Sequence, residues 1–421
     1  MTPCGQHPLI DISHLRHPDP TSPHRLHAIS SIRTALLDYG YFYASAISEF
    51  PPTYLEEMYD YARRCHALPA EVKRKYGQRD GGTGSYSGPD VGLEELRYEG
   101  EGGAMATVSG WDYSRVGFSL GSSSDGTDAD AADSTIMDLR PALQVLPAED
   151  GRYPSTQDGI DPPFAIAMDE LYGRQDVLGR VLLEGFEDAL GVPRRTFLDM
   201  FEGDDGGRGQ GDFGTIRLLS YPGRVVEGDV QRGGNGDDEN KDDDDDDENK
   251  DDSDTERTGI GAHTDFECFT LMHQNAPGLQ LMPRCRDALG HGHGHGHGHG
   301  NNEFGKWIDA PVRPGDFLVI IGDMFERLTN GMLRATPHRV CLTDHPRESI
   351  IRFNAFAPDT IVRPLDLFVN STAEGVPRPL YTPVKMRTHM ETTMRNLEKG
   401  IASWDAEEGR SRSATHEYND E

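Results

Sequence analysis

The sequence predicts a mainly β fold with flanking helices, in which a sandwich or jelly-roll core is covered on an outer face by helices. The first observation is a series of short apolar runs in the second half of the chain, each bounded by turn residues. The second is a set of apolar stripes at helical spacing, mainly in the first half. This order of elements favours a sandwich or jelly-roll over a parallel α/β sheet. The predicted strands cover residues 215–221, 267–272, 279–282, 317–321, 338–342 and 350–356.

The N-terminal part of the chain is predicted to be mostly helical. A short strand over residues 9–12 comes first, and apolar residues then recur at helical spacing over 26–36. Residues 41–43 are predicted to form a strand, and a second helical stripe follows over 55–65. The stretch 81–110 is rich in glycine, serine and acidic residues, which predicts a loop.

The middle and the end of the chain contain two further predicted helices. Residues 121–134 are almost all Ser, Gly, Asp and Ala, too polar to pack, so a mobile linker is expected there. A strong helix is predicted over 178–190, where Gly191 follows the last apolar residue. A last helix is predicted over 384–403 and is followed by a polar tail.

These patterns divide the chain into six regions with two insertions. The regions are an N-terminal helical and strand region 7–120, a mobile linker 121–160, a helical layer 161–205, a β core 206–360, a C-terminal extension and helix 361–405, and a disordered tail 406–421. The low-complexity insertions cover residues 228–257 and 286–303 and are expected to lie on the surface of the core.

Both insertions have a plain and a functional interpretation. The first holds an acidic run over 237–254, with 13 acids against 2 lysines, which is either a solvated insertion or a cation-binding element. The second is an alternating Gly-His repeat from His291 to His299, which is either a low-complexity loop that binds nickel or zinc adventitiously or a genuine metal site. The plain interpretation is preferred for both.

Composition excludes some classes of function. The net charge is −31, and removing the net −11 of the acidic run still leaves −20, which argues against nucleic acid as a partner. Five scattered cysteines without a CxxC motif indicate reduced thiols rather than a disulfide framework. No signal peptide or apolar run of membrane-spanning length is present, so we expect a cytoplasmic monomer without membrane contact.

Three residues indicate a metal site. His263 and Asp265 form a His-x-Asp pair, and His338 lies 73 residues beyond the aspartate. Residues i and i+2 of a strand point to one face, so His263 and Asp265 are expected to reach one ion from one strand, and His338 from another. Two histidines and one carboxylate on one side of an ion leave its other positions open, which is typical of non-haem Fe(II) oxygenase sites.

Further motifs around these residues extend the pattern over roughly residues 7–400. They are Leu9–Ile12, Asp38–Tyr43, Arg217–Pro222, His263–Phe266, Gly278–Leu281, Trp307–Asp309, Pro314–Phe317, Ile321–Met324, Leu328–Gly331 and Thr336–Val340. In these motifs the chain resembles the iron- and 2-oxoglutarate-dependent dioxygenases of the isopenicillin N synthase-like group, and the match is most specific over residues 275–340. That resemblance implies a double-stranded β-helix, or jelly-roll, core and a dioxygenase-type N-terminal region.

A 2-oxo acid that chelates iron needs a cation for its far carboxylate, and the planar fork of arginine suits that role. The family has an Arg-x-Ser about nine residues after its last histidine ligand, where this chain has Arg347 and Ser349. The resemblance therefore implies that Arg347 and Ser349 bind 2-oxoglutarate, with Tyr221 as a further donor. Arg352 is the competing arginine; Arg347 is preferred because strand alternation places it on the same face as Ser349.

The resemblance implies an enzyme that uses Fe(II), 2-oxoglutarate and O2 to hydroxylate, desaturate or cyclise a small organic molecule, with succinate and CO2 as co-products. A role in specialised metabolism is the expected setting. Two alternatives stay open: an oxidase like isopenicillin N synthase, which needs no 2-oxoglutarate, and a catalytically idle protein that binds a metal or a small molecule. Near the site, residues 111–113 and Phe118 are expected either to line the substrate mouth or to pack in the helical layer.

Overall fold

The computed structural model of this chain describes residues 7–76, 93–99, 105–115, 153–203, 213–223, 258–284, 306–369, 379–398, 401–405 and 410–412. Both low-complexity insertions and Phe118 lie outside these residues. All statements below refer to the described part of the chain.

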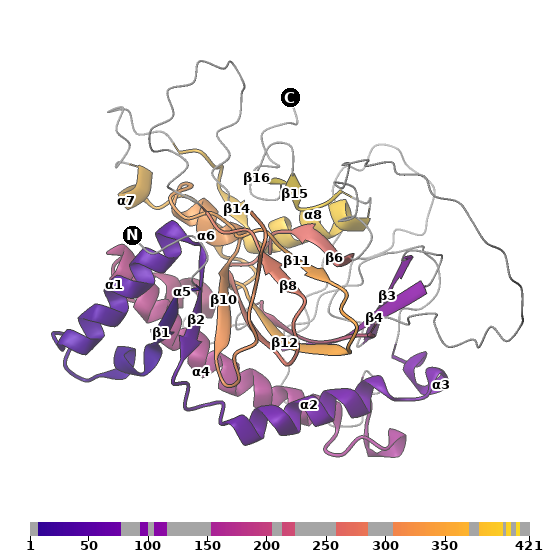
Figure 1. Cartoon of the computed structure of the whole chain (residues 1–421). Coiled ribbons are helices and arrows are strands. Elements are labelled where there is room, and N and C mark those ends of the chain that lie inside the picture. Colours follow the sequence, from indigo (N-terminus) through magenta and orange to yellow (C-terminus); the bar gives the residue numbers. More distant parts are fainter. Residues whose placement is uncertain are drawn as a thin grey trace, which may run out of the picture.

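An eight-stranded sheet forms the larger wall of the core (Figure 1). Its strands are antiparallel except for the first pair, which runs parallel. Half of them come from the N-terminal region of the sequence. In spatial order the strands are β1 (Leu9–Asp11), β2 (Tyr41–Ser45), β10 (Phe317–Ile321), β7 (Phe269–Gln274), β12 (Arg347–Asn354), β5 (Thr215–Tyr221), β4 (Met105–Ser114) and β3 (Leu93–Glu99).

A four-stranded antiparallel sheet forms the smaller wall. Its strands in spatial order are β6 (Thr258–His263), β11 (His338–Cys341), β8 (Leu279–Leu281) and β9 (Ile308–Asp309). An apolar core joins the two sheets, with Leu219, Met272 and Ile351 from the larger sheet and Leu281 and Val340 from the smaller one. The prediction of a jelly-roll core with flanking helices is confirmed.

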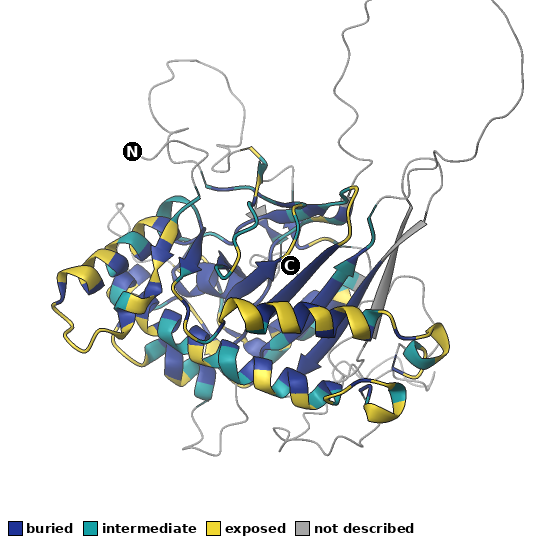
Figure 2. Ribbon diagram, turned by 60° about the horizontal axis from the view of Figure 1, so that its bottom comes forward, coloured by how far each residue is buried: buried dark blue, intermediate teal, exposed yellow. Residues whose placement is uncertain are grey.

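Helices cover the other face of the larger sheet, with their outer residues exposed (Figure 2). The longest is α4 (Phe164–Leu190), whose apolar residues recur every three or four positions and which ends at Gly191, at a φ of 71° that favours glycine. Its Phe186 meets the sheet at Phe269, with ring centroids 5.5 Å apart. The other helices are α1 (Pro23–Asp38), α2 (Pro52–His66), α3 (Ala70–Lys73), α5 (Thr196–Glu202), α6 (Asp323–Leu328), α7 (Asp366–Val369), α8 (Met386–Glu398) and the 3₁₀ turns Ile12–Arg16 and Thr156–Asp158.

Strand alternation separates the two sides of the larger sheet. In β12, Ile350 packs into the core beneath the helices, whereas Ile351 packs between the two sheets. Every second side chain of a strand therefore faces the interior between the sheets, and the others face the helical layer.

Two small hairpins complete the described structure: β13 (Ile361–Val362) with β14 (Val384–Lys385), and β15 (Trp404–Asp405) with β16 (Arg410–Ser411).

The prediction of a loop over 81–110 is wrong for residues 93–99 and 105–110, which form β3 and most of β4; the other residues of this stretch lie outside the described structure. Glycine and serine within β4 interrupt its apolar alternation, and β3 carries many charges. Charged residues are common in a strand at the edge of a sheet, which is where β3 lies. A composition that indicates a loop can therefore also belong to an edge hairpin.

Two predicted mobile regions are partly wrong. Within the linker, residues 153–160 pack in the structure: Tyr153 is buried and stacks on Phe164, with ring centroids 5.2 Å apart. Within the predicted disordered tail, residues 410–412 include β16, and Ser411 is buried. Both segments are held by contacts with residues far away in the sequence, which local composition does not report. The rest of both regions lies outside the described residues.

Trp111 and Tyr113 pack in the helical layer and do not line the core interior. The Trp111 ring lies 5.4 Å from that of Phe164, and Tyr113 lies 6.3 Å from Tyr172. Asp112 faces the opposite way.

None of the helices in the described residues is long and apolar enough to cross a bilayer.

A buried ion pair joins β4 and β5 at directly opposite positions of the ladder. Asp112 accepts two hydrogen bonds from Arg217, at 2.6 Å each. We expect Asp112→Ala to lower the free energy of unfolding by about 3 kcal/mol, because it removes one partner of a buried pair. Urea unfolding measures this. Asp366→Ala is the control, since it breaks the exposed Arg363–Asp366 pair and should cost less than about 1 kcal/mol. Equal losses in the two variants would contradict the expectation.

Candidate metal centre and co-substrate pocket

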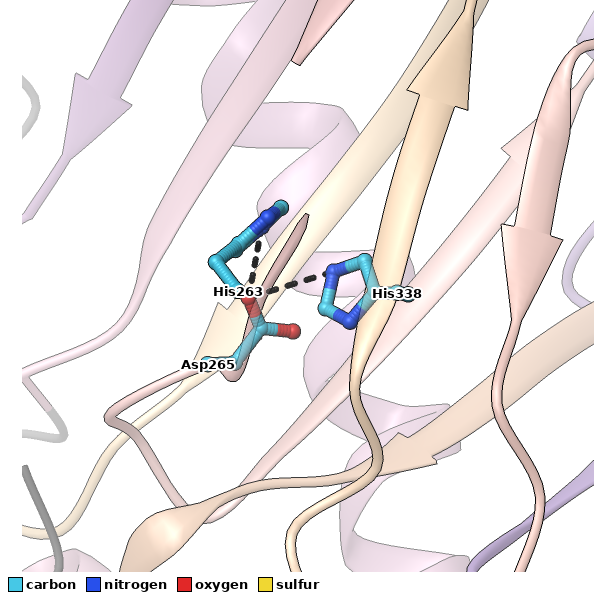
Figure 3. Close-up of side chains that lie close together, drawn as sticks. All are labelled: His263, Asp265 and His338. Atoms are coloured by element: carbon cyan, nitrogen blue, oxygen red, sulfur yellow. Dashed lines mark ion pairs between the residues drawn. The ribbon is translucent and has the colours of Figure 1, made fainter. Parts of the chain in front are cut away.

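The three predicted ligands converge at the end of the smaller sheet (Figure 3). His263 is the last residue of β6 and His338 the first of β11, and the two are directly paired across the ladder. Asp265 lies beyond the end of β6, so the expectation that it shares one strand with His263 is wrong. The chain leaves the smaller sheet at Thr264, and the Asp265 carbonyl accepts from the amide of Asp323, 2.9 Å away. A turn, and not strand alternation, aims the carboxylate.

The spacing of the ligand atoms suits a single ion. Asp265 Oδ1 lies 3.6 Å from His338 Nε2 and 3.8 Å from His263 Nε2. The three ligand atoms all lie within 4.8 Å of one another. Atoms that each bind one ion at about 2.1 Å stand about 3–4 Å apart, so this group can close around a metal with little movement.

Neighbouring groups orient each ligand. His263 Nδ1 lies 2.9 Å from the carbonyl oxygen of Gly261, and His338 Nδ1 lies 3.1 Å from that of Thr336. Each ring then donates from Nδ1 and turns Nε2 toward the centre. Thr270 donates its hydroxyl to Asp265 Oδ2, which leaves Oδ1 for the metal. Such hydrogen bonds fix tautomer and orientation at metal sites.

The electrostatics keep His263 available as a ligand. Burial, and then the neighbouring His338 ring, lower the pKa of His263 to about 4, so the imidazole is neutral at neutral pH. Burial also raises the pKa values of Glu267 and Asp323 well above their usual range, which favours the uncharged forms of these two nearby carboxyls. Asp265 and His338 are buried, whereas the His263 side chain is 30% exposed, so the site opens on the His263 side.

Arg347, Ser349 and Tyr221 come together in the interior of the core. Arg347 and Ser349 have the same alternation as Ile351 and thus face the interior, and Tyr221 pairs with Arg347 across the ladder. The guanidinium carbon lies 4.7 Å from the centroid of the Tyr221 ring. Burial raises the pKa of Tyr221, so its hydroxyl keeps its proton. All three residues are buried.

Several polar atoms in this pocket lack a hydrogen-bond partner in the described structure. They are Nε and Nη1 of Arg347 and Oγ of Ser349. Buried donors without partners are rare, and guanidinium and hydroxyl donors form strong hydrogen bonds to a carboxylate. The residues present therefore fit the far carboxylate of a 2-oxo acid.

Arg352, the competing arginine, lies on the other face of β12. Its guanidinium carbon sits 3.8 Å from the centroid of the Tyr172 ring, and Nε donates to Asn354 at 2.9 Å. Asp176 of α4 lies 3.7 Å away. These contacts belong to the helical layer.

Sequence reasoning missed two supporting residues on β7. Thr270 holds Asp265, and Gln274 accepts a hydrogen bond from Arg347 Nη2 at 2.9 Å while donating to the Ala310 carbonyl, also at 2.9 Å. The sequence held a signal for them: Thr270, Met272 and Gln274 occupy every second position of a strand whose residues are all buried, so their side chains share one face. Polar residues on the inward face of such a strand need partners.

Comparisons with known proteins agree with this site. The family described as the 2OG-Fe(II) oxygenase superfamily matches residues 241–355, and that of the non-haem dioxygenase in morphine synthesis N-terminal region matches residues 7–100. Homoarginine-6-hydroxylase 2-ODD-C23 of Glycine max is 27% identical over 368 residues, or 85% of this chain and 88% of that protein. Homoarginine-6-hydroxylase 2-ODD-233 of Oryza sativa subsp. japonica is 29% identical over 227 residues, 53% of this chain and 52% of that one.

A solved structure shows the same fold. Full-length Neurospora crassa T7H in complex with alpha-KG and thymine superimposes with a TM-score of 0.61 over 94% of this chain and 99% of that one, at 16% sequence identity. The family matches together extend over both the N-terminal region and the core that holds the ligand cluster. The chain therefore belongs to the 2OG-Fe(II) oxygenase superfamily and is a non-haem Fe(II), 2-oxoglutarate-dependent dioxygenase.

Proposed function

We propose that His263, Asp265 and His338 hold Fe(II), and that Arg347, Ser349 and Tyr221 hold the far carboxylate of 2-oxoglutarate. The observation that carries the proposal is the unpartnered donor set of Arg347 and Ser349, buried in the same interior that the three ligands border. The substrate is a small organic molecule. In a hydroxylation, substrate C–H, O2 and 2-oxoglutarate give substrate C–OH, succinate and CO2.

Each part of the chain has a distinct task in this proposal. Arg347 neutralises the far carboxylate, Ser349 donates to it, and Gln274 holds the guanidinium in place. Apolar residues between the sheets, such as Leu281 and Ile351, exclude water from the reaction. Iron, when bound, supplies the redox chemistry that activates O2.

The substrate enters, in this proposal, on the side of His263, because the other two ligands are buried. The relatives named as homoarginine-6-hydroxylases favour hydroxylation of a small polar molecule in specialised metabolism. L-Homoarginine is thus the first compound to test.

Anaerobic addition of Fe(II) and then 2-oxoglutarate should produce a visible metal-to-ligand charge-transfer band. Admission of air should then release succinate, and more of it when a substrate is present. Succinate separates this activity from that of an oxidase that needs no 2-oxoglutarate, and O2 consumption separates it from an idle binding protein. Absence of the band with folded protein would refute the proposal.

Substitution of Gln274 should change the KM for 2-oxoglutarate by a smaller factor than loss of Arg347 itself. We expect Gln274→Leu to raise the KM for 2-oxoglutarate about tenfold, because loss of the hydrogen bond lets the Arg347 guanidinium turn away from the carboxylate. Iron affinity should stay unchanged in this variant. Thr270→Val is the matched control on the same strand: it should weaken iron binding through Asp265 and leave the KM of the iron-saturated enzyme unchanged. The same response from both variants would contradict the assignment.

We also propose that the protein is a cytoplasmic monomer. Among the described cysteines, Cys65, Cys268 and Cys341 form no disulfide with one another, as expected in a reducing compartment. Light scattering coupled to gel filtration should give the chain mass of 46.5 kDa. Twice that mass would overturn the monomer.

A further inference from the structure

The residue between two proposed iron ligands is held by the C-terminal end of the chain. Thr264 separates His263 from Asp265 and is buried. The β15–β16 hairpin follows α8 and lies beside β6 (Figure 1). The contacts below show that it meets the ligand turn through its polar groups.

Two serines of the hairpin segment bind Thr264 on three of its polar atoms. Ser403 Oγ accepts from the Thr264 amide at 3.0 Å and donates to the Thr264 carbonyl at 2.9 Å. The Thr264 hydroxyl donates to Ser411 Oγ at 3.1 Å. Within the hairpin, the Arg412 amide donates to the Ser403 carbonyl at 2.6 Å. Both serines are buried, so water does not compete for these hydrogen bonds.

Nearby residues extend the same contact. His389 of α8 places Nε2 3.0 Å from the Phe266 carbonyl, one residue past Asp265. The Asp323 carboxyl is hydrogen-bonded to both Thr264 and Ser411. The C-terminal segment therefore reaches the ligand turn on both sides of Asp265.

The hairpin depends on this contact for its own order. Its strands have two residues each, and isolated hairpins of that size are marginal in water. Trp404 is buried and anchors one strand. Ser403 and Ser411 connect it to the ligand turn, so the order of the hairpin and that of the turn are linked.

We propose that Ser403 and Ser411 are positioning residues that clamp the turn carrying His263 and Asp265 in the geometry needed for the metal. This inference rests on the proposed iron site. By reciprocity, a metal bound at the site stabilises the C-terminal hairpin. A purely structural hairpin would leave metal affinity unchanged.

The test compares metal binding by the unmutated full chain, a double variant and a control variant. Titration with Co(II), followed through its visible absorption, should give a Kd raised about 10–100-fold in the Ser403→Ala/Ser411→Ala double variant. The affinity of the metal-saturated protein for 2-oxoglutarate should stay within about twofold, since Arg347 belongs to the other sheet. Ser109→Ala is the control: this buried β4 serine is hydrogen-bonded to His66, away from the ligand turn, and its loss should not change the Kd.

Hydrogen–deuterium exchange of the unmutated protein covers the case in which the double variant does not fold. Co(II) should slow exchange in residues 401–412 as well as in 258–266. Unchanged exchange in 401–412, or a folded double variant with the Kd of the control, overturns the clamp. Failure of the unmutated protein to bind Co(II) and Fe(II) overturns the iron site itself, and the two failures are thereby distinguished.

Discussion

Asp265→Ala is expected to abolish Fe(II) binding and to lower kcat/KM by at least about 10⁴-fold, equivalent to about 5.5 kcal/mol of transition-state stabilisation. The carboxylate is the only anionic member of the triad, and Thr270 already holds its orientation. Without it, two imidazoles remain to bind a dication, and one of them, His263, is partly exposed. Anaerobic iron titration and succinate release measure the two losses.

Glu267→Gln is the matched control for this prediction. Glu267 is a second buried carboxyl two residues away, but burial raises its pKa well above the usual range, which favours the uncharged form. Its amide replacement preserves the size of the side chain and resembles that uncharged form, so iron binding should survive. A variant without Asp265 that still gives the charge-transfer band, or loss of iron in Glu267→Gln equal to that in Asp265→Ala, would contradict the assigned ligand set.

Arg347→Leu is expected to raise the KM for 2-oxoglutarate about 10³-fold, or about 4 kcal/mol, with iron binding retained. The guanidinium is buried with two nitrogens unpaired, so it is the cation that a far carboxylate requires in that pocket. Initial rates of succinate formation against 2-oxoglutarate concentration give the KM. Iron titration of the same variant shows whether the metal site is intact.

Arg352→Leu separates this role from the general effect of losing a buried arginine. Arg352 is equally buried but packs on Tyr172 and Asn354 in the helical layer. Its loss should lower thermal stability and leave the KM for 2-oxoglutarate unchanged. If Arg352→Leu raised the KM and Arg347→Leu did not, the two arginines would have to exchange roles.

Much of this fold could be predicted from local pattern. Strand alternation placed Arg347 and Ser349 on one face, and that face is the interior. Helical spacing and Gly191 predicted the end of α4 correctly. These features depend on neighbours in the sequence, which the pattern contains.

The errors arose where distant contacts decide the structure. Asp265 lies outside the strand because the amide of Asp323, the first residue of α6, donates to its carbonyl. The β4 strand is stabilised by pairing with β5 and by packing against the helical layer. Ser411 is ordered by Thr264, which lies 147 residues earlier in the chain. Composition marked the last two regions as loop or tail, and no local pattern could have shown their partners.

The two halves of the site belong to different walls of the core. His263 and His338 belong to the smaller sheet, and Tyr221, Arg347 and Ser349 to the larger one. A molecule that chelates the ion and also binds Arg347 is therefore in contact with both sheets. Metal or co-substrate alone contacts only one of the two sheets, whereas both together connect them. Binding of both should therefore also make the interior in which the substrate binds more rigid.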